Sequence, residues 1–236
     1  MSLPNTFSIP VTEELISLYN QSGHINLPRF LEPDFAEELT GSLERHDGYK
    51  LATYINNQVL NLPFSHWQNL SAQEKQAMHQ QIMHNASQGI GYLYGRSSLE
   101  TAGAQTSTYK ALSAWLNSTE VLTWVRKITG AGDICAVSLQ ASRFSPGHFL
   151  TRHKDHHATE QRRVAFVLNF NREWHPDWGG LLQFYSQDGN PQKAWPPVYN
   201  SMNLFDVDRV HSVTYVTPFA RQPRFAFSGW FRATPL

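Results

Sequence analysis

The sequence predicts a mainly β fold with helices, in which a β-sandwich or barrel is braced from outside by helices of the N-terminal half. Two observations lead to this class. Up to about residue 130, hydrophobic residues recur mostly at helical spacing, and from Ile134 they form short apolar or alternating runs separated by turn residues. The first pattern indicates amphipathic helices, and many short strands at close spacing are typical of a sandwich or barrel.

Four helices are expected before residue 130. Thr12 is a candidate N-cap for the first and Gly23 a stop signal, while Ser71 and Glu74 have the spacing of a capping box at the start of the third. The expected helices are Val11–Asn20, Asp34–Arg45, Ser71–Ala86 and Ala111–Ile128.

The stretches between these helices carry weaker signals. His24–Phe30 alternates and is predicted to be an edge strand, because Pro28 cannot donate to a central ladder. Tyr49–Leu62 is rich in β-forming residues and predicts one or two strands. Gly89–Gly103 is rich in Gly and Ser and is predicted to be a loop, either a plain connection or a mobile lid over a substrate.

The C-terminal half is predicted to hold the β core. Turn residues such as Pro146-Gly147 and Pro196-Pro197 separate its runs, and no linker or repeat divides the chain. We therefore expect a single domain over residues 1–236, with a helical support region at 1–130 and the core at 131–236. The expected strands are Ile134–Phe144, Val164–Phe170, Leu181–Tyr185, Met202–Phe205, Val210–Val216 and Arg224–Phe231.

Composition excludes several classes of protein. Hydrophobic residues make up 41% of the 236, enough for a sizeable core, and the formal net charge of zero gives no reason to expect direct binding to nucleic acid or an anionic membrane. The only cysteine, Cys135, lies in an apolar stretch, so disulfides do not hold the fold. The first residues show neither a signal peptide nor a membrane span, so a cytoplasmic protein is expected.

His153 and Asp155 form the strongest chemical signal. In an extended strand, residues two apart project to the same face, so an imidazole and a carboxylate would point together. His211, at the start of a later run, is the candidate for a third ligand on a neighbouring strand. Two histidines and one carboxylate leave open positions on a metal, the pattern of non-haem Fe(II) oxygenases. His156 and His157 remain alternative ligands, and His148 and His175 are expected to be ordinary loop histidines.

An oxygenase of this type needs an electron source, most commonly 2-oxoglutarate. Its distal carboxylate requires a buried cation, and the forked guanidinium of arginine suits it better than lysine does. Arg224 opens the last strand and shares a face with Ala226, Ser228 and Trp230, so Arg224 with the Ser228 hydroxyl could hold this carboxylate. Arg221, in the preceding loop, is the rival.

With these positions in view, the chain resembles the Fe(II)/2-oxoglutarate dioxygenases, in particular the prolyl 4-hydroxylase-like branch. The resemblance covers roughly residues 130–232, and less securely His24–Leu43. It rests on an ordered set of segments: Phe144-x-x-Gly147-x-Phe149-x-x-His153-x-Asp155, Arg162–Asn169, Trp178–Phe184, Asn200–Asp206 followed by His211, and Arg224–Trp230.

The resemblance implies a double-stranded β-helix (jelly roll) with iron between its two sheets. It implies that His153, Asp155 and His211 bind the iron and that Arg224 binds 2-oxoglutarate. Phe144 and Asn169 depart from the tyrosines that relatives often have, and the Asn169 amide could still donate a hydrogen bond in the cosubstrate pocket. Trp230 and Trp178 line a substrate path or belong to the core.

The implied activity is hydroxylation of a C–H bond with O2 and release of succinate and CO2, with ascorbate as an additional reductant. The branch implies a prolyl residue in a protein as the substrate, with a free amino acid or other small molecule as the alternative. Two further classes remain open: a non-catalytic jelly-roll binding module, and a metal-dependent hydrolase or isomerase in which Arg224 would have no special role.

Overall fold

The computed structural model describes residues 9–98 and 107–236, which form twelve strands, six α-helices and one short 3-10 helix. The helices are α1 Glu13–Ser22, α2 Pro33–Arg45, α3 Phe64–Asn69, α4 Ala72–Ser87, α5 Ser107–Leu116, α6 Thr119–Thr129 and the 3-10 turn η1 Pro176–Trp178. The strands are β1 His24–Pro28, β2 Lys50–Ile55, β3 Gln58–Pro63, β4 Tyr92–Ser98, β5 Ala136–Phe144, β6 Phe149–His153, β7 Arg162–Asn169, β8 Leu182–Tyr185, β9 Pro191–Trp195, β10 Ser201–Asp206, β11 His211–Val213 and β12 Arg224–Arg232.

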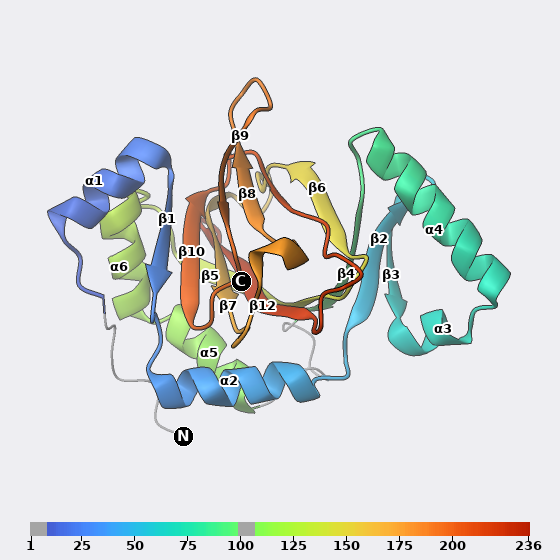
Figure 1. The fold of residues 1–236 in the computed structure, drawn as a ribbon. Coiled ribbons are helices and arrows are strands. Elements are labelled where there is room, and N and C mark those ends of the chain that lie inside the picture. The colour runs from blue at the N-terminus through green and yellow to red at the C-terminus, as the bar shows by residue number, and fades with distance from the viewer. Residues whose placement is uncertain (1–8, 99–106) are drawn as a thin grey trace.

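The strands form a single antiparallel sheet that curls on itself (Figure 1). Its order is β1-β10-β7-β12-β5-β4-β6-β11-β8-β9, with β2 and β3 attached beside β4. β4 joins the two walls, because Gly95–Ser98 pair with β5 while Tyr92 and Leu93 pair with β6. The sheet therefore forms a half-barrel whose inner face holds a cavity, which agrees with the predicted jelly roll. β1 to β4, from the region expected to be helical support, belong to this same sheet.

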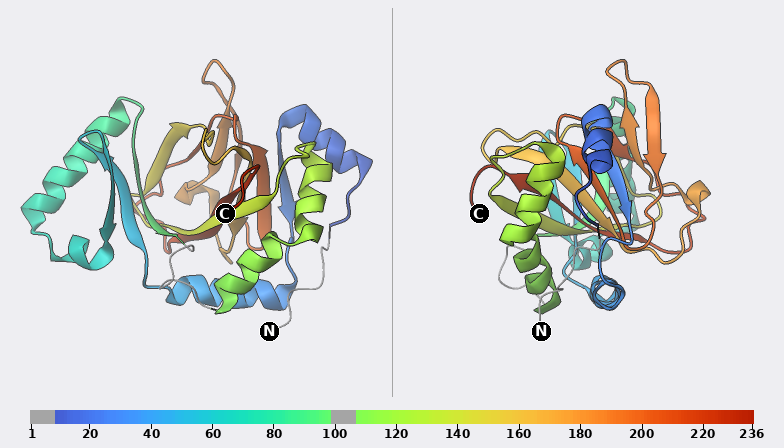
Figure 2. Two further views of the ribbon diagram at one scale, coloured as in Figure 1. Left: turned by 180° about the vertical axis from the view of Figure 1, so that it is seen from behind. Right: turned by 90° about the vertical axis from the view of Figure 1, so that its left-hand side faces the viewer.

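Helices cover the sheet from outside (Figures 1 and 2). α1 packs on α6 and β1, α2 and α5 pack on each other and on β12 and β5, and α3 and α4 pack on β2 and β3. Their apolar faces share the largest core with outward-facing residues of β7, β10 and β12, such as Phe166, Leu204 and Phe227. Burial of this apolar surface stabilises β7, β10 and β12, whose opposite face lines the cavity.

The predicted caps are confirmed. The Thr12 hydroxyl accepts from the Leu15 amide at the start of α1, and Gly23 ends that helix with φ of 65°. Ser71 and Glu74 form a reciprocal capping box at α4. His24–Pro28 is an edge strand that pairs only with β10, as expected from Pro28.

Two predictions on the N-terminal half are wrong. The helix expected over Ala111–Ile128 is two helices, because the Ser118 side chain caps a new helix at the Val121 amide. The loop expected over Gly89–Gly103 contains β4, which pairs with three strands, and the remainder of that stretch from residue 99 lies outside the described residues. Ladder partners on both sides outweigh the low β-propensity of its Gly and Ser residues.

Three smaller features also differ from expectation. The short helix α3 and the strand β9 were not predicted. β5 begins at Ala136, one residue beyond Cys135, which is exposed rather than enclosed in an apolar strand. The sequence of β9 shows no alternation of apolar and polar residues, because four of its five residues are exposed and it pairs only with β8.

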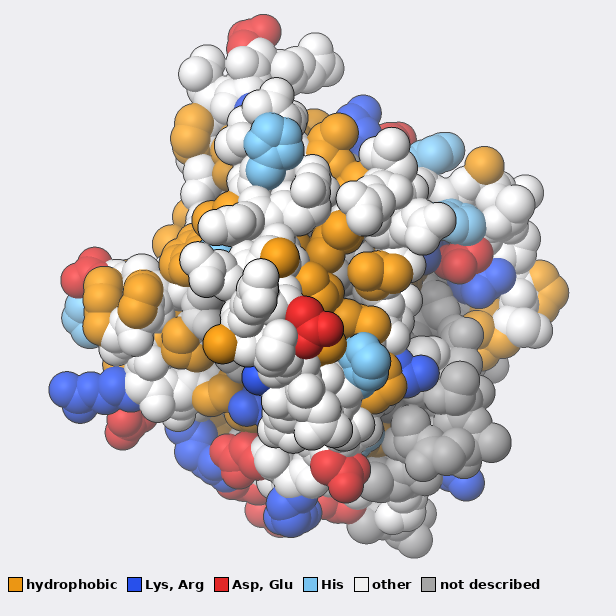
Figure 3. All heavy atoms as spheres, turned by 90° about the vertical axis from the view of Figure 1, so that its right-hand side faces the viewer, with side chains coloured by type: hydrophobic (Ala, Val, Ile, Leu, Met, Phe, Trp, Pro, Cys, Tyr) orange, Lys and Arg blue, Asp and Glu red, His pale blue; other side chains and the backbone are white. Residues whose placement is uncertain are grey.

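The surface on the α3–α4 side carries acidic and basic side chains interspersed with hydrophobic ones (Figure 3). This mixture agrees with the formal net charge of zero. Among the described helices, none combines the length and the apolar character needed to cross a membrane.

Candidate metal centre and cosubstrate pocket

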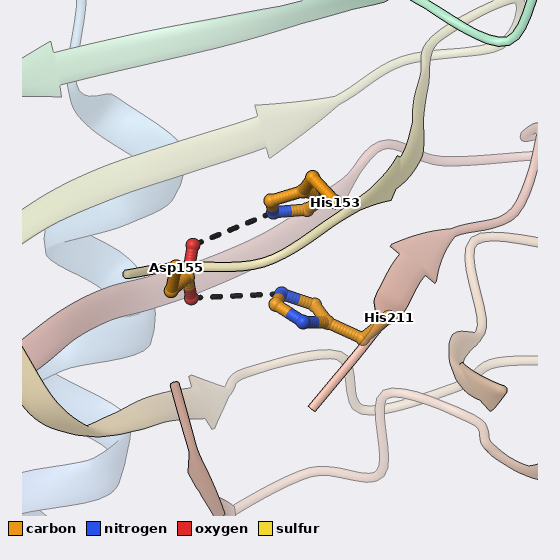
Figure 4. A group of neighbouring side chains, drawn as sticks. All are labelled: His153, Asp155 and His211. Atoms are coloured by element: carbon orange, nitrogen blue, oxygen red, sulfur yellow. Dashed lines mark ion pairs between the residues drawn. The ribbon is translucent and has the colours of Figure 1, made fainter. Parts of the chain in front are cut away.

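The structure brings His153, Asp155 and His211 together on the inner face of the half-barrel (Figure 4). His153 ends β6 and His211 begins β11, and the two residues are direct partners in the antiparallel register. Asp155 follows two residues after His153, and its amide donates to the Val207 carbonyl at 2.9 Å. The period of two along a strand and one cross-strand pair are therefore sufficient to assemble the three side chains.

Both imidazoles are held by the nitrogen that faces away from the cluster. Nδ1 of His153 lies 2.9 Å from the Thr151 carbonyl, and Nδ1 of His211 lies 2.9 Å from the Arg209 carbonyl. A carbonyl can only accept, so each Nδ1 carries a proton, and in the neutral form of each imidazole Nε2 keeps a free lone pair. This is the backbone support that metal-ligating histidines usually have.

The free Nε2 atoms face the Asp155 carboxylate. His153 Nε2 lies 3.4 Å from Oδ1, and His211 Nε2 lies 3.5 Å from Oδ2. Burial alone would raise the pKa of the Asp155 carboxyl, but His211 and His153 hold it well below its usual range. Burial lowers the pKa of His211 to about 4, so its imidazole is neutral near pH 7. A deprotonated carboxylate and a neutral imidazole are the forms that bind metal.

The three residues fit a divalent metal ion. Their ligand atoms lie within 4.8 Å of one another, and among the described residues no other group of three His, Cys, Asp or Glu side chains meets this condition. Two imidazole nitrogens and one carboxylate oxygen on one side suit Fe(II) and leave the other side open to ligands.

A cavity of about 260 Å³, partly open to solvent, extends from these residues into the half-barrel. Arg224 also lines it, although the residue is only 2% exposed. Its guanidinium donates one hydrogen bond, from Nη2 to Asn169 Oδ1 at 3.3 Å, and its buried Nε has no partner. Burial lowers the pKa of Arg224 to about 10, so it remains charged. A buried charge without an ionic partner is costly, and an anion in the cavity would compensate it.

The neighbours of Arg224 fix its position. Asn169, which accepts its hydrogen bond, donates through Nδ2 to the Ser201 hydroxyl at 3.2 Å. The Phe144 ring lies 5.3 Å from the guanidinium carbon. Gly180, with φ of 62°, lies so close to the arginine stem that a Cβ there would be 3.3 Å from Arg224 Cδ. The cation is thus fixed at a set place in the cavity wall.

This arrangement fits 2-oxoglutarate. The molecule has an oxo-acid end that can chelate a metal and a distal carboxylate that needs a cation. The cavity offers three candidate metal-binding side chains and, in Arg224, a buried forked cation without an ionic partner. His153, Asp155 and His211 would hold the metal, and Arg224 the distal carboxylate.

The other candidate residues lie in different places. Ser228 lines the cavity and accepts from Gln140 Nε2 at 3.3 Å, whereas Asn169 orients Arg224. Arg221 is exposed, which removes it as a buried cation. His156 and His157 are exposed, and neither lines the cavity. Trp230 lines it, while Trp178 packs against Trp174.

Sequence reasoning missed two residues near the site. Tyr94 of β4 lines the cavity with its ring stacked on Phe144, but it lies in the stretch predicted to be a loop. His148 does lie in the turn between β5 and β6, yet it is 8% exposed and its Nδ1 has no hydrogen-bond partner. The alternation Tyr92, Tyr94, Arg96 was the available signal for β4.

Comparison with known proteins identifies the domain. Residues 139–232 match the 2OG-Fe(II) oxygenase superfamily. The chain is 30% identical over 115 residues to the prolyl 3-hydroxylase OGFOD1 of Mus musculus; the match covers 46% of this chain and 21% of that protein. The chain thus spans only about a fifth of the length of this curated relative.

Solved structures agree on the fold. A prolyl-4-hydroxylase of Pseudomonas putida superposes with a TM-score of 0.63 at 19% identity, covering 94% of this chain and 98% of that one. A prolyl hydroxylase of Trichoplax adhaerens, in complex with a peptide of hypoxia inducible factor, also gives 0.63 at 14% identity, covering 93% and 87%.

Fold and site thus agree with a jelly roll that carries a candidate non-haem iron site. Residues 139–232 match the 2OG-Fe(II) oxygenase superfamily, and the predicted resemblance to its prolyl 4-hydroxylase-like branch is confirmed. The cofactors of this superfamily are Fe(II) and 2-oxoglutarate, and the three metal-binding side chains and Arg224 lie within the matched residues.

Proposed function

We propose that this protein hydroxylates a C–H bond of a prolyl residue in a protein, using Fe(II), 2-oxoglutarate and O2. The observation that carries the proposal is that the three candidate metal-binding side chains and the buried Arg224 line one cavity. A protein substrate is supported by the curated prolyl 3-hydroxylase relative and by the structural relative that holds a peptide.

The residues of the chain would act by binding and orienting. His153, Asp155 and His211 present their lone pairs on one side of the metal, which leaves the other side for the cosubstrate and O2. Arg224 sets the distance of the cosubstrate from the metal, because Asn169 and Phe144 restrict its guanidinium. When bound, iron and 2-oxoglutarate supply the oxidative chemistry, and the cosubstrate leaves as succinate and CO2.

Anaerobic addition of Fe(II) and 2-oxoglutarate tests the cofactor part of the proposal. The native protein should develop the weak visible charge-transfer band of the chelate, and Arg224→Ala should lose most of it at the same ligand concentration. A native protein that binds Fe(II) but gives no band would contradict the proposal and favour a binding module. Turnover that persists without 2-oxoglutarate would favour a metal-dependent hydrolase or isomerase.

Peptide arrays test the substrate part. Proline-containing peptides should gain one oxygen atom by mass spectrometry, in step with succinate release, and Asp155→Ala should abolish both. Oxidation of free amino acids without oxidation of any peptide would show that the substrate is a small molecule.

We also propose a cytoplasmic location, supported by the single exposed cysteine and a fold that needs no disulfide.

A further inference from the structure

Tyr94 lines the cavity that also holds Arg224 and the three candidate metal-binding side chains. The residue is 8% exposed, and its ring lies face to face with Phe144, with centroids 4.8 Å apart and planes 3° from parallel. The guanidinium of Arg224 lies over the Phe144 ring at 5.3 Å. Tyr94 already covers one face of Phe144, so Arg224 must lie over the other. The Phe144 ring therefore lies between the Tyr94 ring and the Arg224 guanidinium.

Charged groups of the cavity wall act on Tyr94. Asp155 and Arg96 both act on its hydroxyl electrostatically. Asp155 is one of the three metal-binding side chains. Tyr94 lines the same cavity as His153 and Asp155, and its hydroxyl is within electrostatic reach of the Asp155 carboxylate.

Most other polar groups of the cavity wall are already engaged with protein acceptors. Gln140 donates to Ser228 at 3.3 Å, Ser142 donates to the Ala226 carbonyl at 3.1 Å, and Arg96 donates to Asn61 at 2.7 Å. The indole of Trp230 faces Asp155, and Arg162 covers its ring at 3.6 Å.

Tyr94 also has a proton to donate, as does the buried indole Nε1–H of Trp230, which has no hydrogen-bond partner. Arg96 and Gln140 approach its hydroxyl as hydrogen-bond donors, so the phenol oxygen accepts from them. Burial raises the pKa of Tyr94, and these two donors oppose that rise only in part, so the hydroxyl keeps its proton. The hydroxyl oxygen accepts from neighbouring donors, so its O–H remains available to donate a hydrogen bond. An anionic ligand in the cavity would accept that hydrogen bond.

We infer that the Tyr94 hydroxyl binds the cosubstrate, donating a hydrogen bond to the oxo-acid end of 2-oxoglutarate, the end that the metal holds. This inference rests on the proposed function. It assigns the two ends of the cosubstrate to different strands, the distal carboxylate to Arg224 of β12 and the oxo-acid end to Tyr94 of β4.

Tyr94→Phe tests the inference, because it removes the hydroxyl and keeps the stacked ring. Anaerobic titration of the Fe(II)-loaded protein should show 2-oxoglutarate binding about ten- to hundredfold more weakly, the range of a lost hydrogen bond to a charged group. Fe(II) affinity measured without 2-oxoglutarate should stay unchanged, since Tyr94 is not a metal ligand. The matched control is Tyr54→Phe, whose hydroxyl donates to Asn57 on the surface and whose titration should equal that of the native protein.

A shorter ligand tests which end is bound. 2-Oxobutanoate has the oxo-acid end but no distal carboxylate, so Tyr94→Phe should weaken it by the same factor as 2-oxoglutarate. Native-like 2-oxoglutarate affinity in Tyr94→Phe, or an unchanged affinity for 2-oxobutanoate, would overturn the inference while the proposed function stands. A native protein that binds Fe(II) but no 2-oxoglutarate would overturn both.

Discussion

Arg224 places a positive charge inside the half-barrel at a cost in stability. It is 2% exposed, and its hydrogen bond to Asn169 is to a neutral amide. Removing a charge from water costs several kcal/mol, and one neutral hydrogen bond recovers about 1 kcal/mol. A residue that stabilised only the empty fold would not need to be charged here. Arg224 therefore makes sense as a group whose ionic partner arrives with the ligand.

Arg224→Met tests this interpretation of the charge. Methionine keeps much of the volume without the charge, so the free energy of unfolding of the ligand-free variant should equal or exceed that of the native protein. At 2-oxoglutarate concentrations about 100 times Kd, with a redox-inert divalent metal present, ligand binding should stabilise the native protein by about 2.7 kcal/mol and the variant by almost nothing. Thermal unfolding with and without ligand measures both effects.

Arg224→Lys is the matched control, because it keeps the charge and loses the fork. It should bind 2-oxoglutarate more weakly than the native protein and more tightly than Arg224→Met. A methionine variant destabilised by several kcal/mol without ligand would show instead that the charge supports the fold itself.

Asp155 faces both imidazoles, so its removal should abolish the metal site. Loss of even a supporting group typically lowers metal affinity 10- to 100-fold, and Asp155→Ala, which removes a ligand, should cost more than about 100-fold. Competition with a coloured chelator measures the affinity for Fe(II) or Mn(II). Asp208→Ala, whose carboxylate is 66% exposed beside His156, is the control and should keep native affinity. Native affinity in Asp155→Ala would place the metal elsewhere.

Single residues explain why the metal-binding residues were predictable and Tyr94 was not. His153 and Asp155 are two apart on an extended segment, so the period of the strand places them together before any tertiary contact is known. His211 follows from the need for a ligand on a neighbouring strand, and the register His211–His153 supplies it. Tyr94 has no such local partner, because Phe144 and Asp155 reach it only through the closure of the sheet.

At the level of elements, the loop between η1 and β8 supports the cosubstrate pocket. Gly179 and Gly180 both have positive φ, and a Cβ on Gly180 would meet Trp174 at 3.0 Å, Val216 at 3.2 Å and Arg224 at 3.3 Å. In the structure, Gly180 lets the backbone approach the stem of Arg224.

Gly180→Ala should therefore lower both stability and cosubstrate affinity. A left-handed backbone costs an alanine roughly 1–2 kcal/mol, and the contacts around Arg224 should add to this loss. Gly130→Ala is the matched control, because Gly130 caps α6 at φ of 73° and a Cβ there would meet nothing within 4 Å. It should lose stability to a similar backbone strain and bind 2-oxoglutarate normally. Chemical denaturation and ligand titration of both variants separate the two effects.

Elements were predictable where local signals acted alone. The caps at Thr12 and Ser71 form within one turn of helix, so α1 and α4 follow from the sequence. Ser118 is equally a good cap, but the apolar spacing of Ala111–Ile128 continues across it and conceals the break between α5 and α6. β4 depends on ladders to β2, β5 and β6, and these non-local hydrogen bonds leave no trace in its composition.

For the whole molecule, burial of histidines couples stability to pH. His148 is 8% exposed, and burial lowers its pKa to about 4; a hydrogen bond to the Arg143 backbone opposes this shift, and the Arg143 charge adds to it. Below pH 6.5 the unfolded chain takes up a proton at this residue that the folded protein does not, so folding weakens as pH falls from about 6.5 to 4. His211, with its pKa also lowered by burial, contributes with the same sign, while the raised pKa of His153 opposes it.

His148→Gln should reduce this acid sensitivity. Linkage with the two pKa values gives a loss on the order of 2 kcal/mol between pH 7 and pH 5 from His148 alone, and the glutamine variant should lack that part of the loss. Urea unfolding of the metal-free native and variant proteins at both pH values measures it, and comparison of the two proteins cancels the contributions of His153 and His211. The exposed His79→Gln controls for substitution of an imidazole and should behave as the native protein does. Equal losses in native and His148→Gln proteins would show that the turn between β5 and β6 opens at acid pH and lets His148 take up its proton in the folded state.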